Sequence, residues 1–175
     1  MPAEFDFFQK FPNNYFLETG SYLGYGVEQA LKAGFKNILS IEVNEEYYKQ
    51  CVKKFKGNSN VKLFLGDSKK MLWDMIKNIN DQITFWLDSH YFVSQDVPSG
   101  EKLSTLMDEI DIIYRHNVKT HKILIDDVRL WKTDYGVDIE DVKRKIKNIN
   151  SNYGFTRGTG HESLPNDIFI AQVYV

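Results

Sequence analysis

The sequence contains a single cysteine among 175 residues, which excludes an internal disulfide. Cys51 lies in a segment with helical spacing, so we expect it to be a small buried residue, and its isolation fits a reducing, cytoplasmic location. The chain also lacks an apolar run of about 18 residues, the length that crosses a membrane. Neither charge sign dominates, since 22 basic and 24 acidic residues give a net charge of −2. We therefore expect neither nucleic acid nor a membrane as a partner.

The most informative stretch covers residues 15–26 and reads YFLETGSYLGYG. A short apolar run is followed by an acidic residue and then by three glycines within seven positions. Good helix formers follow from Val27 to Ala33, and Gly34 is placed to end that helix. Strand, glycine turn and helix in this order let a ligand approach the backbone amides at a helix N-terminus.

The spacing of these glycines discriminates between ligands. A dinucleotide-binding turn has the order G-x-G-x-x-G, which allows a pyrophosphate to lie on the turn. Here the order is G-x-x-x-G-x-G, and Glu18 stands two residues before the first glycine. A carboxylate at this position would repel a pyrophosphate and would suit a ligand that carries an ammonium group.

Beyond this stretch, apolar runs alternate with segments of helical periodicity. The alternation predicts an α/β fold with a parallel sheet and helices on both faces, in one domain spanning 1–175 with a short N-terminal cap at 1–14. Asn44 and Ser68 are the expected N-caps of two of the helices. The expected strands are 15–17, 37–42, 61–65, 83–87 and 122–125, then a hairpin near 154–157 and 168–175. The expected helices are 27–33, 45–56, 69–79, 102–116 and 138–149.

An acidic residue ends each of the first five predicted strands. In open parallel sheets, ligands bind beyond the carboxyl ends of the strands. Glu42, at the end of the second strand, lies 24 positions after Glu18 and is placed to accept hydrogen bonds from both hydroxyls of a ribose. This position predicts a nucleoside ligand without identifying the cofactor. The five acidic strand ends are Glu18, Glu42, Asp67, Asp88 and the pair Asp126–Asp127.

The segment 18–26 resembles the first motif of the class I S-adenosylmethionine (SAM)-dependent methyltransferases. The strand and helix order from Tyr15 to Val175, with its terminal hairpin, is similar to their Rossmann-like, doubly wound, seven-stranded and mostly parallel sheet. The resemblance implies SAM as the cofactor, with Asp67 accepting a hydrogen bond from the adenine amino group. The cofactor-binding residues that we expect on this basis are Glu18, Thr19, Gly20, Ser21, Gly24, Gly26, Glu42, Asp67, Ser68 and Asp88.

Asp88, Asp126 and Asp127 form a second group of acids. Carboxylates are ligands that Mg²⁺ prefers, and the group resembles the metal site of the cation-dependent O-methyltransferases, with an Asp-Asp pair as in their sugar-modifying branch. The resemblance implies that Mg²⁺ or Mn²⁺ polarises a hydroxyl of a small-molecule substrate and lowers its pKa. His90, two residues beyond Asp88, is a candidate catalytic base or metal ligand, because an unperturbed histidine has a pKa of about 6.5.

Two alternatives from other functional classes remain open. Asp88, His90, Asp126 and Asp127 would also suit a metal-dependent hydrolase, although such sites usually contain more histidines. The chain could instead be a non-catalytic nucleoside-binding domain, because a fold alone does not establish chemistry. The site could be closed by the loop 91–101 or by a partner subunit in a homo-oligomer, or it could stay open for a larger acceptor.

Overall fold

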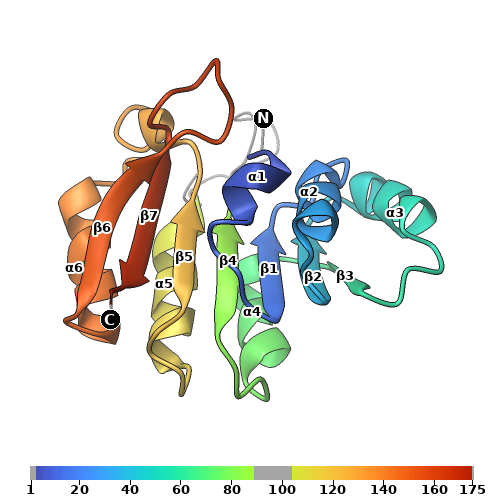
Figure 1. Ribbon diagram of the computed structural model, residues 1–175, viewed down its shortest axis with the longest axis horizontal. Helices are drawn as coiled ribbons and strands as arrows, with labels where there is room; N and C mark the ends of the chain where they lie inside the picture. Colours follow the sequence, from blue (N-terminus) through green and yellow to red (C-terminus); the bar gives the residue numbers. More distant parts are fainter. Residues whose placement is uncertain (1–2, 89–103, 175) are drawn as a thin grey trace.

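The computed structural model describes residues 3–88 and 104–174, which form one seven-stranded sheet in the order β3-β2-β1-β4-β5-β7-β6 (Figure 1). β7 runs antiparallel to its neighbours β5 and β6, and the other pairs are parallel. The predicted mostly parallel sheet with a terminal antiparallel hairpin is therefore confirmed. The strands are β1 (Tyr15–Thr19), β2 (Asn37–Glu42), β3 (Val61–Leu65), β4 (Ile83–Leu87), β5 (Lys122–Ile125), β6 (Tyr153–Gly158) and β7 (Ile168–Val173).

The strand order creates a switch point at the centre of the sheet. From β1 the chain moves outward to β2 and β3, then returns to place β4 on the other side of β1. The connections after β1 and after β4 therefore leave the sheet in opposite directions, which opens a crevice beyond the carboxyl ends of these two strands. This edge, at the top of the sheet in Figure 1, carries the acidic strand ends.

The helices are α1 (Phe5–Phe8), α2 (Tyr25–Ala33), α3 (Glu45–Lys54), α4 (Ser68–Ile76), α5 (Leu106–Arg115) and α6 (Ile139–Ile149), with a short 3₁₀ helix η1 (Val128–Leu130) after β5. The helix expected at 102–116 was predicted too long. It begins only at Leu106, after Ser104, whose hydroxyl accepts a hydrogen bond from the Leu106 N–H at 3.2 Å. The helices expected at 45–56 and 69–79 also end earlier, at Lys54 and Ile76.

One of the two expected helix caps is confirmed and the other is wrong. The Asn44 side chain accepts hydrogen bonds from the N–H groups of Glu46, at 2.9 Å, and Tyr47, at 3.1 Å. At α4, however, Asp67 is the N-cap, and its carboxylate accepts from the Lys69 N–H at 3.1 Å. Ser68 is instead the first residue of the helix.

Both faces of the sheet are buried, as a doubly wound fold requires. Side chains alternate along each strand, so Phe85 and Ile123 pack toward α4, α5 and α6, whereas Trp86 and Leu124 pack toward α1 and α2. All four are completely buried. Phe8 of α1 contacts Trp86 edge to face, with ring centroids 5.1 Å apart. The expected N-terminal cap is therefore part of the hydrophobic core on the α1 and α2 side of the sheet.

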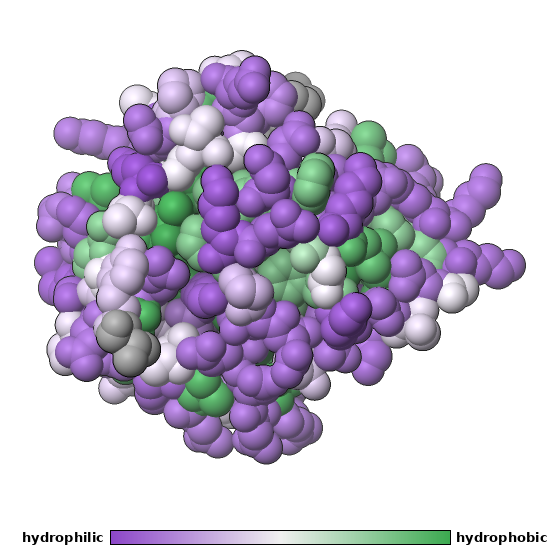
Figure 2. Space-filling model, viewed as in Figure 1, coloured by the Kyte–Doolittle hydropathy of each residue, from purple (hydrophilic) through white to green (hydrophobic). Residues whose placement is uncertain are grey.

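Hydrophilic side chains cover most of the face seen in Figure 2, and hydrophobic ones show between them near its middle. Among the described residues, no helix has both the length and the apolar character needed to span a membrane.

A buried pair of histidines lies near the starts of β4 and β5, at the edge opposite the acids. The Nδ1 atom of His121 accepts a hydrogen bond from the Ile83 N–H at 3.1 Å, so its proton is on Nε2, which donates to Nδ1 of His116 at 2.9 Å. Nε2 of His116 then donates to the carbonyl of Ile76 at 3.0 Å. Each ring is satisfied in its neutral form. Burial lowers the pKa of His121 to about 3, with His116 and Lys119 as further causes.

We predict that this pair makes the protein less stable in mild acid. The folded state keeps His121 neutral, whereas the unfolded chain protonates it below its ordinary pKa of 6.5. The contribution of neutral, buried His121 to the free energy of unfolding is therefore fully present above pH 6.5. It decreases by about 1.4 kcal/mol per pH unit as the pH falls toward the pKa of His121 in the folded state.

The measurement is urea unfolding between pH 4 and 8 for the wild type and for His121→Gln. The variant should be less stable than the wild type at pH 8, and this difference should shrink or reverse as the pH falls. Parallel pH profiles would contradict the prediction.

Candidate functional site

The glycine turn after β1 is held against the end of β2. The N–H groups of Gly20 and Ser21 both donate to the carbonyl of Ile41, at 2.9 and 3.2 Å. Gly24 has φ +75°, and a Cβ there would lie 2.6 Å from the Phe55 ring of the segment that follows α3. Both the backbone conformation and the close packing therefore require glycine at this position.

Glu42 links this turn to the segment after β2. Its carboxylate accepts hydrogen bonds from the N–H groups of Tyr22, at 2.7 Å, and Asn44, at 2.8 Å, one on each oxygen. Each oxygen has a further lone pair, so the carboxylate can still accept the two hydroxyls of a ribose. The position predicted from the sequence therefore fits a nucleoside.

Large hydrophobic side chains border Glu42 and remain exposed to solvent. Val43 follows it directly and is 55% exposed, Tyr22 is 51% exposed, and Leu65, at the end of β3, is 40% exposed. The Tyr22 ring packs against that of Tyr47, with centroids 4.7 Å apart. Exposed apolar side chains beside a strand-end carboxylate offer a surface on which a flat, partly apolar group such as a purine can lie.

Cys51 contributes to the same turn as a structural residue. Its side chain is buried, as predicted, and the thiol donates a hydrogen bond to the carbonyl of Tyr22 at 3.2 Å. Burial raises the pKa of this thiol to about 11, with Glu18 and Glu42 as further causes. The neutral thiol therefore helps to hold the turn against α3 and is not activated as a nucleophile.

Glu18 lies beneath the turn and is only 2% exposed. One carboxyl oxygen accepts a hydrogen bond from the Ser40 hydroxyl at 2.5 Å, and that hydroxyl is 2.5 Å from the hydroxyl of Ser21. Burial raises the pKa of Glu18 to about 8, while the Ser40 bond opposes the rise and Glu42 adds to it. The neutral acid is therefore favoured at pH 7. The expected interaction of Glu18 with an ammonium group remains a prediction.

Gly26 is needed because the Glu18 carboxyl group occupies the space beside it. A Cβ at residue 26 would lie 1.8 Å from Oε1 of Glu18. The carboxyl group is buried and hydrogen bonded, so it cannot easily move aside. The glycine therefore admits the side chain of Glu18 under the first turn of α2.

Gly26→Ala provides a test in which two physical effects have opposite signs. Helix propensity alone would stabilise the protein by about 1 kcal/mol, whereas the clash with Glu18 should destabilise it by about 1–3 kcal/mol. We expect a net loss of unfolding free energy in the wild-type background. In Glu18→Ala, which removes the obstacle, the same substitution should be neutral or stabilising. Urea unfolding of the four proteins measures this coupling, and additive effects would argue against it.

Asp67 and Ser68, both expected to bind the cofactor, also have structural partners. Besides capping α4, the Asp67 carboxylate lies 3.6 Å from the Lys69 ammonium and 3.8 Å from that of Lys70. Ser68 is buried, and its hydroxyl is 3.2 Å from that of Thr105, just before α5. The Asp67 side chain keeps 15% exposure, so part of it remains accessible to a ligand.

Asp88 and Asp126 lie at the ends of neighbouring strands. The Asp126 N–H donates to the carbonyl of Leu87 at 3.1 Å, and the Asp88 N–H donates to that of Thr19 at 3.2 Å, which continues the pairing of the strands. Burial raises the pKa of Asp88 well above its ordinary value, and the charges of Asp126 and Asp127 add to this. Burial, followed by the charge of Asp127, also raises the pKa of Asp126 to about 7.

These two acids line a cavity of about 10 Å³ beyond the end of β4, large enough for one water-sized occupant. Glu109 of α5 and Tyr135 also line it, and neither was singled out from the sequence. Glu109 is buried and accepts a hydrogen bond from the Thr105 hydroxyl at 3.0 Å. In the sequence it resembles an ordinary polar position of an amphipathic helix, so no signal distinguished it.

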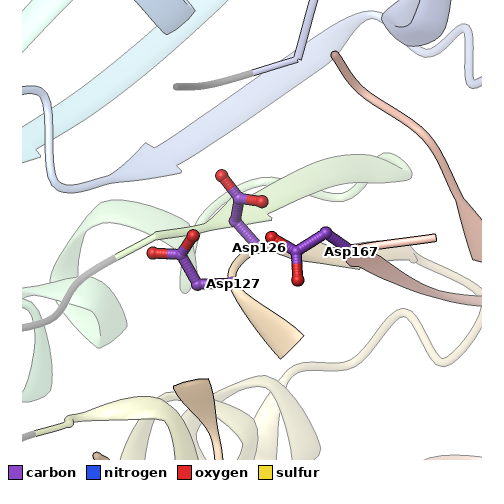
Figure 3. Close-up of side chains that lie close together, drawn as sticks. All are labelled: Asp126, Asp127 and Asp167. Atoms are coloured by element: carbon purple, nitrogen blue, oxygen red, sulfur yellow. The ribbon is translucent and has the colours of Figure 1, made fainter. Parts of the chain in front are cut away.

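Three carboxylates come together beyond β5: those of Asp126, Asp127 and Asp167, with one oxygen from each lying within 4.8 Å of the others (Figure 3). Asp167 directly precedes β7 and was missed in the sequence, because only the antiparallel pairing of β7 brings it beside β5. Arg129 lies against this group, with Nη1 2.6 Å from Oδ1 of Asp127 and in contact with Asp167. Asp88 interacts electrostatically with this group but does not belong to it.

The histidines of the described segments do not join the acids. His116 and His121 form the buried pair at the opposite edge, and His161 is paired with the Ser163 hydroxyl at 2.7 Å in the loop between β6 and β7. His90, the candidate base, and the loop 91–101 lie outside the described residues.

Comparisons with known proteins give matches in structure only. No family model matches the sequence, and no curated protein matches it. An O-methyltransferase from Bacillus cereus in complex with S-adenosylhomocysteine (SAH) has a TM-score of 0.63 at 13% identity, over 97% of this chain and 78% of that one. The O-methyltransferase TomG from Streptomyces achromogenes, in complex with SAM, has a TM-score of 0.61 at 12% identity, over 98% and 78%.

The N-methyltransferase NodS from Bradyrhizobium japonicum has a TM-score of 0.59 at 11% identity, over 95% of this chain and 90% of that one. Matches at such low identity establish the fold alone. The chain has the Rossmann-like fold of the class I SAM-dependent methyltransferases.

Proposed function

We propose that this protein is a SAM-dependent methyltransferase. The observation that carries the proposal is the arrangement around Glu42, whose carboxylate holds the glycine turn through the Tyr22 N–H beside exposed apolar side chains. A single nucleoside ligand could therefore bond its ribose to Glu42 and lay its base on the apolar side chains. The arrangement lies near the switch point, where such sheets bind nucleotides. Solved structures of the same fold, described as bound to SAM or SAH, support it.

Within this proposal the cofactor residues take distinct roles. Glu42 binds the ribose hydroxyls, Asp67 accepts from the adenine amino group, and Gly20 and Ser21 approach the methionine part. Glu18 supports the turn from below through Ser40. The remaining expected contacts are Thr19, Gly24, Gly26, Ser68 and Asp88.

We further propose that the methyl acceptor is a hydroxyl oxygen of a small molecule. An acceptor hydroxyl must lose its proton when the new bond to carbon forms. Burial raises the pKa of Asp126 to about 7, which suits a general base at neutral pH, and Asp88 lies at the end of the neighbouring strand. His90 is the other candidate for this role.

We also propose that a divalent cation assists the methyl transfer. Mg²⁺ or Mn²⁺ would supply Lewis-acid polarisation of the acceptor hydroxyl. Asp88 and Asp126 line one cavity, and burial together with the charges of neighbouring aspartates raises their pKa values, so a cation would relieve this repulsion, although Asp88 lies outside the carboxylate cluster. Asp127, the third expected ligand, fits only in part because it is ion-paired with Arg129.

Isothermal titration calorimetry with SAM and SAH tests cofactor binding. We expect micromolar affinity for the wild type and a loss of about tenfold or more in Glu42→Ala, because hydrogen bonds to a charged group contribute strongly. Glu46→Ala is the matched control, since Glu46 is an exposed acid in the first turn of α3. Binding of NAD with no heat from SAM or SAH would overturn the proposal.

Methyl transfer from labelled SAM to a panel of catechols, sugars and other hydroxyl compounds tests the acceptor class. We expect transfer that Mg²⁺ or Mn²⁺ increases and that a chelator suppresses, and we expect Asp88→Ala to abolish it. Amines belong in the panel, because an N-methyltransferase shares the fold. Transfer to amines alone would refute the assignment to oxygen.

The two alternatives predict different results in the same assays. A metal-dependent hydrolase would release phosphate from a generic ester and would not bind SAM. A non-catalytic nucleoside-binding domain would bind SAM without transferring its methyl group to any acceptor in the panel.

A further inference from the structure

The acidic cluster beyond β5 already contains a positive charge from the chain itself. Nη1 of Arg129 lies 2.6 Å from Oδ1 of Asp127 and also contacts Oδ2 of Asp167. One guanidinium nitrogen thus contacts two of the three clustered carboxylates. Arginine stays protonated at all ordinary pH values, so this charge is permanent.

The two carboxylates hold Arg129 unequally. Asp167 binds it through the side chain and also accepts a hydrogen bond from the Arg129 N–H at 2.9 Å. The backbone carbonyl of Asp167 accepts another from the Val128 N–H at 3.0 Å. The contact with Asp127 consists of one pairing through Nη1. Asp167 is therefore the stronger anchor of the residue.

The exposure of the side chains gives Arg129 room to move. The Arg129 side chain is 41% exposed, whereas those of Asp127 and Asp167 are 10% and 7% exposed. An exposed guanidinium can leave Asp127 by rotating its side chain while its backbone stays bonded to Asp167. Neither carboxylate has comparable freedom.

We propose that Arg129 is the built-in cation of this cluster and competes with a divalent metal ion for Asp127, while Asp167 anchors it. This inference rests on the proposed metal-assisted function and concerns its control. Asp167 then acts as a positioning residue for Arg129 and is not a metal ligand. A divalent ion bound by Asp126 gains Asp127 only when Arg129 releases it, which keeps the affinity of the wild-type site low.

Manganese binding tests this directly, with Mn²⁺ alone as the probe and free Mn²⁺ measured by electron paramagnetic resonance. We expect Arg129→Ala to bind Mn²⁺ about tenfold more tightly than the wild type, because a competing charge has been removed from a partly buried site. Adding Asp127→Asn to Arg129→Ala should reverse most of the gain. Thermal unfolding of each variant shows whether it remains folded.

Lys132→Ala is the matched control, because it removes one positive charge from an exposed residue of the same segment. It should change Mn²⁺ affinity by less than about twofold, since exposed charges are screened. Unchanged or weaker Mn²⁺ binding in folded Arg129→Ala overturns the proposal, as does an equal gain in Lys132→Ala. Calorimetry with SAH on the same variants keeps this outcome separate from the proposed cofactor binding, which does not involve Arg129.

Discussion

The burial of several carboxylates along one edge of the sheet is the constraint on which the rest of this structure depends. Parallel strands place their carboxyl ends together, so the acids that end β1, β2, β4 and β5 converge in a region of restricted solvent. A buried, uncompensated carboxylate is strongly unfavourable, and each must be paired, hydrogen bonded or protonated. Glu42 accepts hydrogen bonds from two backbone N–H groups. Glu18 accepts one from the Ser40 hydroxyl and has a raised pKa, which favours its protonated form, and Asp127 is ion-paired with Arg129.

These different solutions divide the edge into two regions. Around Glu42 the carboxylate is hydrogen bonded to the backbone of the turn and of the segment after β2, which fixes its direction toward a hydroxyl-bearing ligand. Around Asp88 and Asp126, burial and the charges of neighbouring acids raise the pKa values of both carboxyl groups. The two regions therefore differ in how their carboxyl groups are accommodated.

The opposite edge of the sheet has a different physical character. There the buried rings of His116 and His121 form a hydrogen-bonded chain that begins at the start of β4. This arrangement satisfies every ring nitrogen and joins β4, β5 and the helices next to them. The two edges therefore bury titratable groups in different ways: a hydrogen-bonded histidine pair at one, and several neighbouring carboxyl groups at the other.

Local pattern alone determined the strands, their order along the chain and the acids that follow them. Apolar runs and turn residues are short-range signals, so β2, β3, β4 and β5 were predicted with the bounds that the structure has. Residues that join the site only through packing between distant segments could not be predicted from the sequence. Asp167 reaches the cluster only through the pairing of β7, and Glu109 reaches the cavity only through the packing of α5. The hydrogen bond that Glu18 accepts comes from Ser40, 22 residues away in sequence, which only the pairing of β1 with β2 brings beside it.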